Sequence, residues 1–141
     1  MSRESRRWAG MLLVILPSVM FGGVSILRLL IGDPSYMENP LRQDLWRAGH
    51  AHAGILLILS LVALRYVDEA RLSERLKGVV RAFLPAAAIL MPAAFFLSVL
   101  QPAARQPNGF IYLAYVGATL LAIGVVVLGV GVWRSSAQDG A

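Results

Sequence analysis

Four long apolar segments run through this sequence and restrict the folds that the chain can adopt. They cover about residues 9–31, 45–67, 82–103 and 110–133, and each has the length of roughly 20 residues that an α-helix needs to cross a lipid bilayer. Only 15% of the residues are charged, whereas soluble domains carry about 25%. We therefore predict an all-α membrane protein, a single integral membrane domain over residues 1–141 with four transmembrane helices.

The segments between these spans are short and rich in residues that end helices. Residues 32–40 contain two prolines and a glycine, and residues 105–109 form a second turn. Residues 68–81 carry charges of both signs, which is typical of a solvated connector. Short connections place consecutive helices side by side in opposite directions, so we expect an up-down-up-down four-helix bundle in the membrane.

Basic residues are divided unevenly between the two sides that this arrangement creates. The side of both termini and the middle connector has nine, namely Arg3, Arg6, Arg7, Arg65, Arg71, Arg75, Lys77, Arg81 and Arg134, and the other side has four, namely Arg28, Arg42, Arg47 and Arg105. By the positive-inside rule both termini are then cytoplasmic, and we expect the bacterial plasma (inner) membrane as the location. The net charge of +5 is spread over these short clusters, which indicates topology and not a nucleic-acid partner.

Both histidines of the protein lie in one short run at the start of the second apolar segment, residues 49–54, with the sequence GHAHAG. Histidine titrates near neutral pH and is a common ligand of transition metals, so two of them inside an apolar segment need an explanation. Residues two apart on an α-helix point about 200° apart. His50 and His52 therefore cannot occupy the same ligand position, and the pair can serve two separate sites on opposite sides of the helix.

Polar side chains of other segments are expected at about the depth of these histidines. If the helices alternate in direction, Arg28 of the first segment and the tyrosines of the fourth approach that level in the outer leaflet, close to Arg47. The candidate binding site therefore consists of six residues: His50, His52, Arg28, Arg47, Tyr112 and Tyr115. The arginines either bind an anionic group or reach the headgroups, and the tyrosines either join the site or form an aromatic belt.

Three roles of the histidine pair stay open at this point. The rings can hydrogen-bond a tyrosine, an arginine or a carbonyl and thereby fix the helix register. They can bind haem or a metal ion, or they can form a proton-linked or quinone-type site. The alanines and glycines beside them favour both the approach of a flat ligand and the close packing of a neighbouring helix.

Several functional classes lack the residues that they require. The chain has no cysteine, which removes disulfides, thiolate metal sites and iron-sulfur ligation. No acidic residue lies within the four apolar segments, and no phosphate-binding glycine loop or zinc-protease motif is present. We identify no catalytic residue, and we do not expect a self-contained hydrolase or ATPase.

The run GHAHAG at the outer end of a membrane helix resembles the histidine-bearing helices of haem-copper oxidase and nitric oxide reductase main subunits, and of NnrS-like haem and copper membrane proteins. The resemblance covers about eight residues. In those families such histidines are axial ligands, so the resemblance implies that His50 and His52 bind b-type haem or copper. Those families use many more helices and further histidines. The resemblance therefore implies at most one haem or metal site here, which a second copy of the chain can complete.

Two functions follow as expectations. The first is a small membrane protein whose outer-leaflet histidine site binds b-type haem or a metal in a redox context. The alternative is a non-catalytic subunit or assembly factor of a larger membrane complex, because Gly117, Gly124 and Gly129 of the fourth segment offer places where a partner helix can dock. Both expectations place the chain in the lipid bilayer, as a homo-oligomer or as part of a larger membrane complex.

Overall fold

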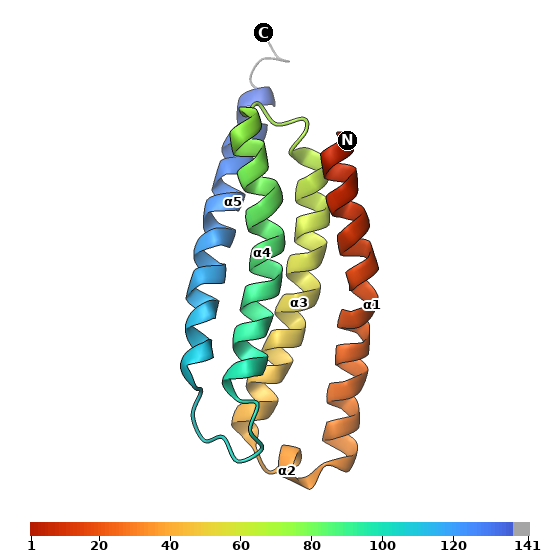
Figure 1. Cartoon of the computed structure of the whole chain (residues 1–141), viewed down its shortest axis with the longest axis vertical. Coiled ribbons are helices and arrows are strands. Elements are labelled where there is room, and N and C mark those ends of the chain that lie inside the picture. The colour runs from red at the N-terminus through yellow and green to blue at the C-terminus, as the bar shows by residue number, and fades with distance from the viewer. Residues whose placement is uncertain (137–141) are drawn as a thin grey trace.

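The computed structural model describes residues 1–136, and within this range it is all-helical. Its elements are α1 (Arg3–Gly32), α2 (Pro34–Met37), α3 (Pro40–Tyr66), α4 (Glu74–Ser98), the short 3-10 helix η1 (Gly109–Tyr112) and α5 (Leu113–Ser136). Helices α1, α3, α4 and the continuous η1–α5 segment are long and apolar enough to cross a membrane (Figure 1). The predicted class, an all-α protein with four long apolar helices, is confirmed. The last residues of the predicted domain, 137–141, lie outside the described range.

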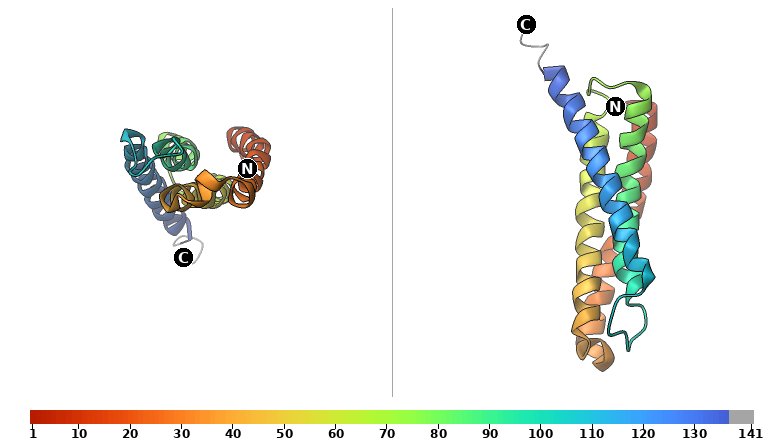
Figure 2. Two further views of the ribbon diagram at one scale, coloured as in Figure 1. Left: turned by 90° about the horizontal axis from the view of Figure 1, so that it is seen from below. Right: turned by 90° about the vertical axis from the view of Figure 1, so that its left-hand side faces the viewer.

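The four long helices lie in an open row. Helix α1 packs on α3, α3 packs on α4, and α4 packs on α5, while α1 approaches α4 at few positions and does not approach α5 within residues 1–136. Figure 2 shows this along the helix axes, with α1 at one margin and α5 at the other. Helices α3 and α4 therefore supply most of the buried residues, whereas α1 contributes only Ser5 and Leu12.

The connections gather at the two ends of the row (Figure 1). The start of α1, the connection between α3 and α4, and the end of α5 meet at one end, where the Arg71 N–H donates a hydrogen bond of 2.9 Å to the Gly131 carbonyl. Helix α2 and residues 99–108 meet at the other end, where Asn39 Nδ2 donates to the Pro102 carbonyl at 2.9 Å. We call these the Arg81 end and the Arg42 end, after the buried arginine near each.

Glycines spaced seven residues apart allow α5 to pack closely against the rest of the row. Gly117, Gly124 and Gly131 are all buried, because a seven-residue spacing keeps them on one face of the helix. A Cβ atom at Gly117 would lie 2.5 Å from Cγ of Met91, and one at Gly124 would collide with Leu84. Larger residues at these positions would push α5 away from α4.

This packing corrects the expectation that Gly117 and Gly124 offer a docking surface for a partner helix. Helix α4 already covers both glycines. Gly129 differs from them, because no atom of the described residues lies within 4 Å of a Cβ atom built on it.

Three helices begin before the predicted apolar segments do, since α1 starts at Arg3, α3 at Pro40 and α4 at Glu74. Helix α3 starts at Pro40, because the Asn39 side chain accepts a hydrogen bond from the Arg42 N–H at 3.1 Å and caps the helix. Helix α4 starts at Glu74 after the cap Ser73, so residues 74–81 form its first turns and are not the predicted solvated connector. Hydropathy marks the part of a helix that lies in lipid, whereas caps decide where the helix ends.

Candidate functional site

His50 projects from α3 against α1. A Cβ atom built on Gly23 would lie 2.8 Å from Nε2 of His50 and 2.9 Å from its Cε1, and one built on Gly22 would lie 3.9 Å from Nδ1. Gly23 therefore makes the space that the imidazole ring fills, whereas a side chain at Gly22 would be in ordinary van der Waals contact with the ring. Neither ring nitrogen of His50 has a hydrogen-bond partner among residues 1–136.

His52 lies against a different neighbour. Its ring packs on Phe95 of α4, with 5.1 Å between the ring centroids, and its Nδ1 lies 2.7 Å from the Ala48 carbonyl oxygen. A carbonyl oxygen only accepts hydrogen bonds, so Nδ1 carries the hydrogen and Nε2 of the neutral ring keeps its lone pair. The two histidines thus face separate helices, which is the two-sided arrangement expected from their spacing.

Gly49, which directly precedes His50 on α3, is part of the helix packing. It is buried, and a Cβ atom at this position would lie 3.0 Å from Cε2 of Phe96 and 3.2 Å from Cβ of Phe95. The close approach of α3 and α4 therefore requires a glycine here. Helix packing therefore explains why this position of the histidine run is a glycine, and a bound ligand is not needed for that explanation.

The two arginines of the predicted site lie apart from the histidine rings. Arg28 is exposed on α1. Arg47 pairs with Asp44 one turn earlier on α3, at 3.1 Å, and its Nε donates to the Gln43 carbonyl at 3.1 Å. Both members of the Arg47–Asp44 pair are exposed, so Arg47 lies on the surface of the row.

The two tyrosines also lie on the surface. Tyr112 is 68% exposed and Tyr115 is 69% exposed, and their rings lie beside each other with 6.2 Å between centroids. Neither hydroxyl forms a hydrogen bond within the described part of the chain. Their exposure at the margin of the row fits an aromatic belt at the membrane surface.

The structure therefore does not bring the six predicted residues into one site. Within residues 1–136 no hydrogen bond or ion pair links either histidine to the arginines or the tyrosines. This range also contains no group of three or more His, Asp or Glu side chains that could hold a metal ion. A ligand bound by this chain would therefore rest on a single histidine at each face of α3.

Sequence reasoning missed a buried cluster at the Arg42 end. The Arg42 guanidinium lies over the Trp46 ring, 4.5 Å from its centroid, and 5.8 Å from the centroid of the Tyr36 ring. Arg42 Nε donates to the Val99 carbonyl at 3.2 Å, and Nη2 donates to the Leu100 carbonyl at 3.4 Å. These carbonyls follow the last turn of α4, where the partial negative charge of the helix attracts a cation.

Tyr36 is the least solvated member of this cluster. Its side chain is fully buried, and its hydroxyl has no hydrogen-bond partner in the described chain. Burial raises the pKa of Tyr36, and the positive charges of Arg47 and Arg42 only partly oppose this shift. The hydroxyl therefore stays protonated across the physiological pH range.

The Arg81 end holds a second polar cluster, which joins three segments. Arg81 is 3% exposed, and its guanidinium contacts an Asp68 oxygen at 2.7 Å and a Glu4 oxygen at 3.0 Å. Its Nε donates to the Ser5 hydroxyl oxygen at 3.1 Å. One side chain of α4 thus holds the start of α1 and the segment that follows α3.

Asp68 is the partly buried counter-charge in this cluster, with a side chain that is 15% exposed. Burial disfavours its ionised form, but the hydrogen bonds that its carboxylate accepts from the Ser2 N–H, from Arg81 and from the Ser2 and Ser5 side chains outweigh that effect and lower its pKa to about 2. The carboxylate is therefore ionised at any physiological pH. The cluster acts as a permanent fastening of the helix ends and not as a switch near neutral pH.

Comparison with known proteins finds no match to this chain among protein families, curated proteins or solved structures.

Proposed function

We propose that the chain crosses the bacterial plasma membrane four times in up-down-up-down order, with both termini in the cytoplasm. The segments that carry nine of the thirteen basic residues gather at the Arg81 end of the row, which supports this orientation by the positive-inside rule. The chain has no cysteine, so single cysteines can test it in intact cells. A membrane-impermeant thiol reagent should label Gln106→Cys and not Arg75→Cys, and the reverse pattern would overturn the orientation.

Within this topology, we propose that His52 is the ligand residue and that it binds a b-type haem or a metal ion through Nε2. The observation that carries this proposal is the hydrogen bond of 2.7 Å from Nδ1 to the Ala48 carbonyl. Such a bond fixes the ring orientation and leaves Nε2 free for a metal, as in many metal-binding histidines. A haem bound there would supply one-electron redox chemistry.

His50 fits a ligand role less well. Its Nε2 faces the backbone of α1 at Gly23, where even a Cβ atom would lie 2.8 Å away. A haem iron cannot approach that nitrogen unless α1 moves. We therefore assign His50 to the packing of α1 on α3, and we propose that only His52 binds a cofactor.

A second ligand would then come from another molecule. Leu56, four residues after His52 on α3, is buried, but Ile55 and Leu59, three and seven residues after it, are exposed. A second copy of the chain can reach this surface and add its own His52, so the proposed site includes a homo-oligomer.

The absorption spectrum of protein purified from cells supplied with haem, iron and copper tests this proposal. We expect a Soret band that disappears in His52→Ala and persists in His50→Ala, the matched control two residues away. Size-exclusion chromatography checks that both variants stay folded. A colourless, metal-free preparation, or equal loss in both variants, would contradict the proposal.

The alternative function is a non-catalytic subunit or assembly factor of a larger membrane complex. The observation that favours it is the apolar surface beside Gly129, an open hollow of about 410 Å³ bordered by Tyr66, Val125 and Trp133. This account expects a larger protein to co-purify in mild detergent and to be lost in Gly129→Trp. A protein that runs alone and retains a cofactor would exclude it.

A further inference from the structure

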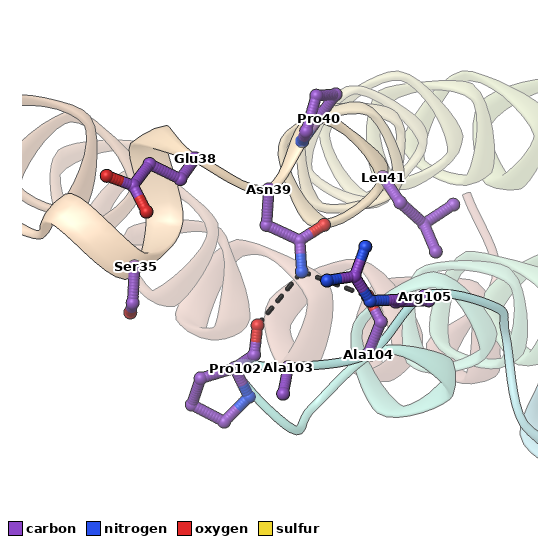
Figure 3. Close-up of a pocket in the computed structure, with 9 residues that line it drawn as sticks. All are labelled: Ser35, Glu38, Asn39, Pro40, Leu41, Pro102, Ala103, Ala104 and Arg105. Atoms are coloured by element: carbon purple, nitrogen blue, oxygen red, sulfur yellow. Dashed lines mark hydrogen bonds between the residues drawn. The ribbon is translucent and has the colours of Figure 1, made fainter.

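A polar hollow of about 460 Å³ opens at the Arg42 end of the row (Figure 3). Residues 35 and 38–41 form one wall, and residues 102–105 form the other. Its volume lies within the range of about 300–1,000 Å³ that is usual for ligand sites. None of its residues belongs to the histidine site proposed above.

Asn39 holds the two walls together. Its Nδ2 donates to the carbonyls of Pro102 and Ala104, both at 2.9 Å, while its Oδ1 accepts from the Arg42 N–H at 3.1 Å. One side chain therefore caps α3 and fixes the segment that follows α4. The hollow is preformed by these hydrogen bonds and does not depend on a ligand to create it.

The hollow has one unpaired charge of each sign. Arg105 and Glu38 both line it, and neither side chain has an ion pair or a hydrogen bond among residues 1–136. Figure 3 shows Arg105 on the Leu41 side of Asn39 and Glu38 on the Ser35 side. The N-terminus of α3 adds its partial positive charge but few free N–H groups, because Pro40 has none and Asn39 accepts from those of Arg42 and Gln43.

The position of the hollow restricts its ligands. It lies where three apolar helices end or begin, since α1 ends at Gly32, α3 begins at Pro40 and α4 ends at Ser98. In a membrane, this is the level of the lipid headgroups. A ligand that satisfies both charges has an anionic group for Arg105 and a cationic group for Glu38, separated by a short linker.

We propose that this hollow binds a phosphodiester that carries an ammonium group on a short linker, the headgroup chemistry of phosphatidylethanolamine. The phosphate contacts the Arg105 guanidinium, with which it forms strong charge-assisted hydrogen bonds. The ammonium group contacts the Glu38 carboxylate. Phosphatidylglycerol, which has the phosphate and lacks the ammonium group, leaves Glu38 without a partner and brings a net negative charge close to it.

Native mass spectrometry of the detergent-purified protein tests the proposal, with dioleoyl-phosphatidylethanolamine and dioleoyl-phosphatidylglycerol added at equal concentration. We expect the first lipid to be retained in excess. Arg105→Ala should lower retention of both lipids about tenfold, the effect of one charge-assisted hydrogen bond. Glu38→Gln should abolish the preference between them. Arg75→Ala, which removes an exposed arginine at the opposite end, is the matched control and should change nothing.

Soluble glycerophosphoethanolamine distinguishes the two sources of this headgroup. If it displaces the lipid, the headgroup alone carries the recognition and a soluble phosphodiester is also a ligand; if it does not, the ligand is the membrane lipid. Equal retention of both lipids by the wild-type protein, or unchanged retention in Arg105→Ala, would overturn the proposal. Because the readout involves neither histidine, its outcome does not depend on the cofactor proposal.

Discussion

Arg81 and Arg42 are buried near opposite ends of the same row of helices, but their charges are accommodated in different ways. Arg81 has three carboxylates within 4 Å, those of Asp68 at 2.7 Å, Glu4 at 3.0 Å and Glu74 at 3.9 Å. Arg42 has no carboxylate within 4 Å among residues 1–136, and it contacts two backbone carbonyls and the faces of two aromatic rings. One end is therefore held by opposite charges, and the other is held by dipoles and π faces.

This difference determines what each end responds to. Carboxylates titrate and need a counter-charge when they are buried, so the Arg81 cluster is sensitive to acid and to the loss of one partner. Carbonyl groups and the Trp46 ring do not titrate, and burial raises the pKa of Tyr36, so its hydroxyl stays protonated. The Arg42 cluster is therefore expected to depend on the shape of the guanidinium group more than on pH.

The largest expected effect is that of Arg81→Ala. The substitution leaves the Asp68 carboxylate, which is 15% exposed, without its cation, and breaking such a buried pair costs about 3–5 kcal/mol. Thermal unfolding in detergent should show this loss. Arg75→Ala, which removes an exposed arginine of the same helix, should stay within about 0.5 kcal/mol of the wild type.

The double variant Arg81→Met with Asp68→Leu should lose less stability than Arg81→Ala alone, because it removes both charges together. A loss below about 1 kcal/mol in Arg81→Ala would remove the contrast between the two ends.

The second effect is the acid response of the Arg81 end. The pKa of Asp68 is lowered from 3.8 to about 2, so its contribution is fully present above about pH 4 and is lost as the pH falls towards 2, with a size of about 2 kcal/mol. The free energy of unfolding, measured between pH 5 and pH 2 in the wild type and in Asp68→Asn, isolates this contribution of Asp68. The variant should not show this part of the loss of stability at low pH. Identical pH profiles would contradict the role given to Asp68.

A smaller effect is expected from Arg42→Lys. Lysine keeps the charge but cannot stack its head on Trp46 and Tyr36 while donating to both carbonyls, so we expect a loss of about 1–2 kcal/mol. Arg81→Lys, measured beside it, should retain more of the stability, because a carboxylate accepts an ammonium group in many geometries. A lysine that substitutes fully for Arg42 would show that its charge alone matters.

The smallest effect is expected from Glu4→Gln. Glu4 is 59% exposed although it contacts buried Arg81 at 3.0 Å, and exposed ion pairs contribute about 0–1 kcal/mol. Raising the salt concentration should reduce the difference between this variant and the wild type. A loss as large as that of Arg81→Ala would mean that Glu4, and not Asp68, is the principal counter-charge.

The sequence predicted the positions of the long helices well, but it predicted poorly where they end and which residues pack against one another. Each of the four apolar segments coincides largely with a long helix, because the bilayer demands a local property, an uninterrupted apolar length. The third segment, 82–103, was predicted too long, since α4 ends at Ser98. Their ends were less predictable, since Asn39 and Ser73 cap helices whose first turns carry charged residues. Caps depend on one side chain and its geometry, and they leave little trace in hydropathy.

For the candidate site, too, the sequence predicted local features and not the contacts between helices. The helical period indicated that His50 and His52 face different ways, and the structure places them against α1 and Phe95 of α4. The positions of Tyr112 and Tyr115 at the margin of the row depend on how α5 is rotated about its axis. That rotation is set by Gly117 and Gly124, whose fit against α4 involves residues roughly 25–40 positions away in the sequence.

By itself, the sequence determined an all-helical chain with four apolar helices and a histidine pair that is divided between two faces, because composition and helical period are local properties. Only the tertiary structure decided that the row is open, that α4 covers Gly117 and Gly124 of α5, and that Arg42 is buried with no carboxylate beside it among residues 1–136. The tertiary structure alone also decided that a hollow lies between Glu38 and Arg105. Each of these depends on contacts between distant segments, and close packing selects among many arrangements with the same local pattern.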